Sequence, residues 1–85
     1  MTEDKQLILE TGKFYFLNQK YDKAIEMFKK GVEYFPEDAD IHFNLGVAYE
    51  GINDLEHAKD CFERVLEINR EYAQAEKHLE KIVNR

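Results

Sequence analysis

The chain has 85 residues, which allows one small domain and excludes an enzyme built from two. Hydrophobic residues make up 44% and charged residues 35%, a composition that is too apolar for a disordered chain and too charged for a membrane span. Twelve Lys and Arg against eighteen Asp and Glu leave a net charge of -6, and because an acidic surface repels phosphate, we expect neither a nucleic-acid nor a membrane partner.

Two helices are predicted in the first part of the chain. The first, near residues 3–18, is indicated by a stripe at the i, i+3, i+4, i+7 spacing of one helix face: Ile8, Thr11, Gly12 and Tyr15. The second, near residues 21–34, has one face formed by Ala24, Phe28 and Gly31. Pro36 stops this second helix, and Asp38 is placed to cap the helix that follows.

The same pattern returns 34 residues later. Helices near residues 39–51 and 55–68 are expected, with Asp54 as the N-cap of the second, and a last helix is expected near residues 73–84. Small and aromatic residues coincide under this shift: Gly12 with Gly46, Tyr15 with Tyr49, Ala24 with Ala58, and Phe28 with Phe62. One domain of residues 1–85 is therefore expected, divided into a first repeat at 5–38, a second at 39–72 and a capping helix at 73–85.

Each repeat has a glycine in the middle of its first helix. A glycine at such a position costs about 1 kcal/mol relative to alanine, so another group must approach closely there. The expected neighbours of Gly12 and Gly46 are Ala24 and Ala58, on the second helix of each repeat. Small residues on both helices would let the two axes come together, while the aromatic rings fill the flanking space.

The period and these residues resemble the tetratricopeptide repeat, a 34-residue helix–turn–helix unit with the pattern W-x2-L-G-x2-Y, A-x3-F and P. The matching stretches are Leu45-Gly46-x-x-Tyr49 and Ala58-x-x-x-Phe62 in the second repeat, and Gly12-x-x-Tyr15, Ala24-x-x-x-Phe28 and Pro36 in the first. The departures are Ile8 and His42 in place of tryptophan, Thr11 in place of leucine, and Arg70 in place of the closing proline. The resemblance implies an all-α fold, an antiparallel helix-pair solenoid of five helices in a right-handed superhelical array. It also implies a protein without catalysis that binds peptides or protein segments in a concave groove.

In that family the first helix of each repeat lines the groove. By the same register, the resemblance implies an apolar floor, consisting of Leu9, Phe16, Phe43 and Val47, and lysines beside it, namely Lys13, Lys77 and Lys81. Such a surface should prefer a segment with hydrophobic anchors and acidic or carboxylate groups. Two simpler interpretations stay open: the lysines of the last helix keep a terminal helix soluble, and the two phenylalanines pack against each other between repeats.

Some relatives grip the C-terminal carboxylate of chaperones with lysines, an arginine and asparagines spread over three repeats. Only Asn44 stands at such a place here, which makes it the eighth candidate groove residue, while the other places hold Leu9, Lys13, Gln74 and His78. Chaperone-tail binding in that mode is therefore not expected.

His57 and Cys61 are spaced i, i+4 on one predicted helix, but two ligands fall short of the four that a structural zinc site uses. No glycine-rich loop and no strand–turn–helix nucleophile motif accompanies the cysteine. We therefore expect no metal, no other cofactor and no catalytic residue, with Cys61 as a small buried hydrophobe. A single cysteine and an acidic N-terminus in place of a secretory signal indicate a reducing, cytoplasmic setting.

Charge and apolar surface are unevenly distributed. Residues 5–38 carry six positive and six negative side chains, whereas residues 39–72 carry three positive and eight negative. The acidic face is most simply a solvated surface, with a basic partner on the convex side as the weaker alternative.

The first helix is apolar around most of its circumference, so something must cover its apolar surface: a second copy, adjoining repeats or a bound partner. The expected function is that of a protein-interaction module serving as scaffold or adaptor, and the alternative is a unit of self-association or a fragment of a longer repeat protein.

Overall fold

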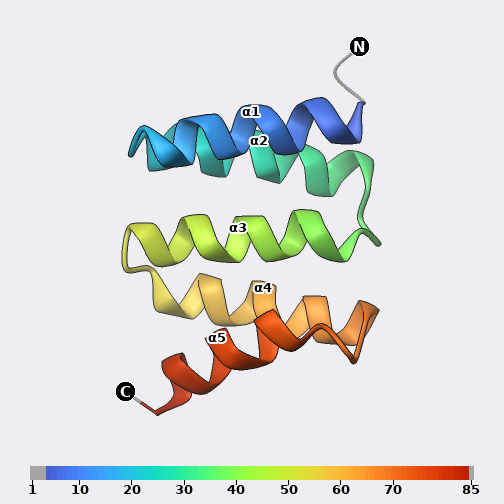
Figure 1. The fold of residues 1–85 in the computed structure, drawn as a ribbon, viewed down its shortest axis with the longest axis vertical. Helices are drawn as coiled ribbons and strands as arrows, with labels where there is room; N and C mark the ends of the chain where they lie inside the picture. Colours follow the sequence, from blue (N-terminus) through green and yellow to red (C-terminus); the bar gives the residue numbers. More distant parts are fainter. Residues whose placement is uncertain (1–3, 85) are drawn as a thin grey trace.

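The computed structural model describes residues 4–84, and five α-helices account for most of them (Figure 1). The helices are α1 (Lys5–Leu17), α2 (Tyr21–Tyr34), α3 (Ala39–Gly51), α4 (Leu55–Ile68) and α5 (Ala73–Val83). The five predicted helices are confirmed, with bounds that agree to within two residues. Residue 3, where the first helix was predicted to begin, lies outside the described residues.

Three of the helices begin at an aspartate that caps them. Asp38 accepts a hydrogen bond from the backbone N–H of Ile41 at 3.2 Å, and Asp54 accepts one from the N–H of His57 at 3.2 Å, as predicted. Asp4 caps α1 in the same way through the N–H of Leu7. The sequence prediction missed this third cap because it began the first helix one residue before Asp4.

The cap at Asp54 makes the stability of the chain depend on pH. Hydrogen bonds from the backbone N–H and the side chain of His57 stabilise the ionised carboxylate and hold the pKa of Asp54 below its usual range. A pKa that is lower in the folded chain contributes stability that is present above the unfolded pKa and lost as the pH falls through the folded value. Thermal unfolding should therefore show that stability falls less between pH 5 and pH 2 in Asp54→Asn than in the unmodified protein, because asparagine still caps the helix but does not titrate. Parallel pH curves for the two proteins would contradict this assignment.

Successive helices pack antiparallel to one another, from α1 at the top of Figure 1 to α5 at the bottom. The helices of each repeat, α1 with α2 and α3 with α4, form close pairs, and α2 packs on α3 to join the pairs. The first helices α1 and α3 also touch each other directly, and α5 packs on α4. The result is an elongated array of 39 × 26 × 16 Å, as expected for stacked helix pairs.

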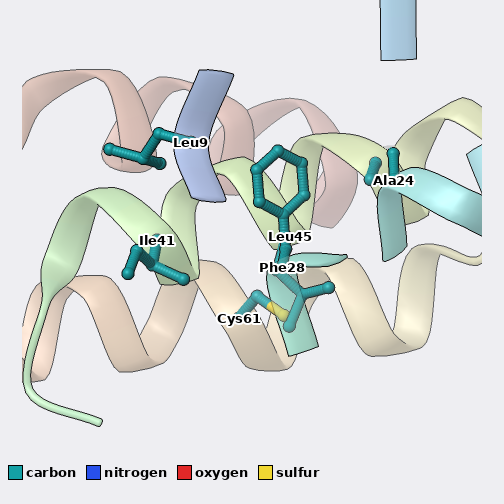
Figure 2. Close-up of a cluster of buried hydrophobic side chains, with 7 residues drawn as sticks. Leu9, Ala24, Phe28, Ile41, Leu45 and Cys61 are labelled. Carbon is teal, nitrogen blue, oxygen red and sulfur yellow. The ribbon is translucent and has the colours of Figure 1, made fainter. Parts of the chain in front are cut away.

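The core consists of two clusters of buried side chains. The first joins α1 to α4, and Figure 2 shows Leu9, Phe28, Leu45 and Cys61 within it. The second lies between α4 and α5 and contains Phe62, Val65 and Ala75. Phe28 and Phe62, one period apart, are almost completely buried. The repeat in the sequence is therefore a repeat in the packing.

An aromatic ring lies closest to each of the two mid-helix glycines. A Cβ atom built on Gly46 would lie 2.7 Å from the ring of Phe62, and one on Gly12 would overlap the ring of Phe28 even more closely. The groups nearest to the glycines are thus the two phenylalanine rings. Both alanines are fully buried, as expected of small residues between closely packed helices.

Candidate functional site

A hollow of about 210 Å³ opens between α1 and α3, on the side of the array where the first helices of the two repeats meet. Its lining comes from three helices: Lys13, Phe16 and Leu17 of α1, Phe28 of α2, and Phe43, Asn44 and Val47 of α3. Five of the eight predicted groove residues line it. The hollow is apolar except for one lysine and one asparagine, so it suits an apolar side chain with a polar group at the rim.

Two residues of this lining were missed by the sequence analysis. Leu17 follows Lys13 by four positions and therefore lies on the same stripe of α1, so helical spacing could have identified it. Phe28 was expected to fill the space beside the small residues of the first repeat, and it is almost fully buried, but it also lines the hollow.

The two predicted floor phenylalanines have different surroundings. Phe16 is half-buried and meets Tyr21 edge-on, with ring centroids 5.2 Å apart. Phe43 is packed between the second repeat and α5, with Phe62 at 5.6 Å and Tyr72 at 5.2 Å. Each ring is held by aromatic neighbours of its own, so each presents a fixed edge to the hollow.

The two polar residues of the lining differ in that Asn44 is hydrogen-bonded to its own helix and Lys13 is exposed. Asn44 donates its side-chain N–H to the backbone carbonyl of Asp40 at 2.8 Å, which fixes the amide against its own helix. Lys13 is exposed and leaves its ammonium group at the rim. A ligand would therefore meet one exposed cation and one oriented amide.

Leu9 does not belong to the floor of the hollow. It is only 8% exposed and is part of the core cluster that joins α1 to α4. Leu9 shares that cluster with buried side chains of α2, α3 and α4, so little of its surface is left for a ligand. Leu9 therefore belongs to the core and not to the candidate groove.

Lys77 and Lys81 are exposed on α5 and do not line the hollow. His78 of α5 reaches α3, where its Nδ1 lies 2.8 Å from Oε1 of Glu50. The imidazole also packs on the rings of Phe43 and Phe62, with centroid distances of 5.3 and 4.9 Å. His78 thus fastens the last helix to the second repeat, and the two lysines stay apart from the candidate groove.

His57 and Cys61, the residues considered for metal or nucleophile chemistry, are engaged in packing and hydrogen bonding within the fold. His57 is exposed, stacks on Tyr49 and lies 2.7 Å from Asp54. Burial raises the pKa of the Cys61 thiol to about 12, which keeps it protonated and unreactive at neutral pH. Within residues 4–84, no three His, Cys, Asp or Glu side chains converge as a metal site would require. None of the helices in the described part of the chain is both long and apolar enough to cross a bilayer.

Within residues 4–84, two similar pairs of antiparallel helices, a fifth helix packed on the second pair, and a hollow along the first helices of the pairs define an α-helical repeat protein. Comparison with family models gives the family: a model of the TPR repeat matches residues 12–53, and a model of the tetratricopeptide repeat matches residues 39–72. The chain belongs to the tetratricopeptide repeat family.

Among curated proteins, the chain is 26% identical over 62 residues to the TPR repeat-containing protein YsoA of Bacillus subtilis, covering 73% of this chain and 19% of the relative. The chain spans about a fifth or less of the length of the curated relatives it matches. It is therefore similar to one segment of each of these longer proteins.

Two solved structures illustrate the likeness of fold. A crystal structure of MamA superimposes with a TM-score of 0.88 and 28% identity, over 96% of this chain and 48% of the other. The second TPR of Spaghetti (RPAP3), bound to the HSP90 peptide SRMEEVD, superimposes with a TM-score of 0.91 and 20% identity, over 98% of this chain and 77% of the other. At that identity the second likeness concerns the fold alone.

Proposed function

We propose that this chain is a non-catalytic protein-interaction module, a scaffold or adaptor that binds a peptide or protein segment along α1 and α3. The single observation that carries the proposal is the apolar hollow between these helices, with Lys13 exposed at its rim. The family and the peptide-bound fold relative support the same kind of function. We also propose the division into repeats at 5–38 and 39–72 with a capping segment at 73–85, since the helix pairs follow it.

The ligand we propose has an apolar anchor next to an acidic side chain. The anchor would lie against Phe16, Phe43 and Val47, because burying its surface there removes apolar area from water. The acidic group would lie close to Lys13. Asn44 would contribute orientation, since its amide is already held by its own helix. The carboxylate clamp of some relatives is not part of this proposal, because His78 is engaged by Glu50.

A labelled synthetic peptide with two leucines flanked by glutamates tests this mode by fluorescence anisotropy. Lys13→Glu and Val47→Ser should each weaken binding by about tenfold, the equivalent of about 1.4 kcal/mol. Lys30→Glu is the matched control for the charge change, because Lys30 is exposed on α2, outside the hollow. Equal losses in Lys13→Glu and Lys30→Glu, or unchanged binding in Val47→Ser, would contradict the proposal.

A second candidate function, self-association, is favoured by the outer face of α1. Leu7 and Phe14 are 52% and 62% exposed, whereas their equivalents one period later, Ile41 and Ala48, are completely buried by packing within the array. Leu17, also on α1, is 79% exposed. An apolar face of this kind is covered in the second repeat and open in the first.

Sedimentation over a range of concentrations tests this candidate. If α1 forms the contact, the average mass should rise with concentration, and Phe14→Ser should abolish the rise. Tyr34→Ser is the control, since Tyr34 is another exposed large side chain but belongs to α2. A constant monomer mass in the unmodified protein would eliminate self-association through α1.

A further inference from the structure

A second hollow lies on the opposite side of α3 from the candidate groove, between α2 and α4. It measures about 330 Å³, and α3 forms its floor through Leu45 and Tyr49. Val32 of α2 and Cys61 of α4 supply apolar walls, and its remaining lining residues are charged or ionisable: Lys29, Glu33, His57 and Asp60. Leu45 and Cys61 also belong to the first core cluster, so only the parts of these side chains that the packing leaves uncovered face the hollow. The hollow shares no residue with the proposed peptide groove.

Fixed side-chain contacts lie at both ends of this hollow. At one end Tyr49 stacks on His57, with ring centroids 5.0 Å apart, and Asp54 holds the imidazole at 2.7 Å. One turn beyond Cys61, Nη2 of Arg64 in α4 forms an ion pair at 2.9 Å with Oε2 of Glu37, which lies just after α2. The first set of contacts lies within the second repeat, and the second joins α4 to the turn before α3. Because both ends are held in this way, the hollow between them has a fixed shape.

The rim of this second hollow is acidic. Within residues 4–84, Glu33 and Asp60 take part in no ion pair, whereas the arginine of α4 is already engaged by Glu37 and Glu67. On α4, further exposed carboxylates lie one turn to either side of Asp60, at Glu56 and Glu63. Lys29 is the only lysine among the lining residues. The second repeat as a whole carries eight acidic and three basic side chains.

We propose that the hollow between α2 and α4 is a second docking surface, which takes a polypeptide segment with an apolar side chain flanked by lysines or arginines. The apolar side chain would lie on Leu45 and against Val32 and Cys61, while the flanking cations would meet Glu33 and Asp60. Charge complementarity decides the occupant, because an acidic rim attracts basic segments and repels acidic ones. The two surfaces of this module would thus select partners of opposite charge on opposite sides of α3, so one chain could hold both.

The experiment uses the complete chain, ¹⁵N-labelled, and a synthetic peptide in which two leucines are flanked by lysines. Titration should shift the amide signals of Val32, Leu45, Tyr49 and Asp60. A peptide with glutamates in place of the lysines should leave these signals unshifted, and a peptide with serines in place of the leucines should bind at least tenfold more weakly. Loss of the lysine dependence or of the leucine dependence would overturn the proposal.

Variants separate this surface from general attraction between an acidic protein and a basic peptide. Glu33→Lys combined with Asp60→Lys should weaken binding at least tenfold, whereas two similar charge reversals away from the hollow, Glu71→Lys with Glu10→Lys, should weaken it by less than threefold. Equal losses in the two double variants, or shifts confined to Lys13, Phe16 and Val47, would also overturn it. Since the two surfaces share no residue, failure here leaves the proposed function along α1 and α3 untouched.

Discussion

Phe62→Ala is expected to lower the free energy of unfolding by about 3–5 kcal/mol. The Phe62 side chain is fully buried in the second core cluster, where it packs against Phe43 and the imidazole of His78. Removing the ring leaves a cavity beside Gly46 of α3 and loosens the contact between α4 and α5. The loss is a large share of the about 5–15 kcal/mol by which small domains are stable.

Urea unfolding followed by circular dichroism measures this loss. Phe14→Ala is the matched control, since it makes the same substitution at a side chain that is 62% exposed, and it should change stability by about 0.5 kcal/mol or less. Equal losses of stability in the two variants would contradict the assignment of Phe62 as buried and Phe14 as exposed.

Gly12→Ala is expected to destabilise the chain, although alanine at an exposed mid-helix site would stabilise it by about 1 kcal/mol. The reversal of sign follows from the ring of Phe28, which occupies the space that a Cβ atom on Gly12 would take. The ring is only 1% exposed and has little room to move aside, so overpacking should cost about 1–3 kcal/mol.

Gly46→Ala supplies a graded comparison in the second repeat. A Cβ atom there would lie 2.7 Å from the ring of Phe62, a milder overlap than at Gly12, so its loss of stability should be the smaller of the two. Both losses can be read from the midpoints of urea unfolding. A gain of stability in Gly12→Ala would show that the helices of the first repeat are farther apart than the structure has them.

The helices of this fold could be predicted from sequence because local signals agree with one another. The period of 34 residues, the caps at Asp38 and Asp54, and the proline after α2 each mark the same boundaries. The neighbours of the glycines were harder to predict. Spacing shows that Gly12, Ala24 and Phe28 belong to one interface, but the rotation of α2 about its own axis decides that the ring of Phe28 lies nearest to the glycine.

The candidate site was predictable only in part, because position within a repeat does not determine exposure. Leu9 and Phe43 are equivalent under the repeat, yet Leu9 is buried and Phe43 reaches the hollow. The difference comes from the neighbours of each side chain: Leu9 packs into the core cluster that spans α1 to α4, whereas Phe43 packs on Phe62 and His78 and keeps one edge at the hollow. Likewise, the sequence shows a lone histidine at position 78, and only the fold brings Glu50 within 2.8 Å of it.

The most direct measurement of the central claim is a chemical-shift map of the ¹⁵N-labelled chain titrated with the peptide of leucines and glutamates. The account predicts that the largest shifts fall on the residues of the hollow between α1 and α3: Lys13, Phe16, Leu17, Asn44 and Val47. Saturable shifts centred on α2 and α4, with these five amides unchanged, would contradict it.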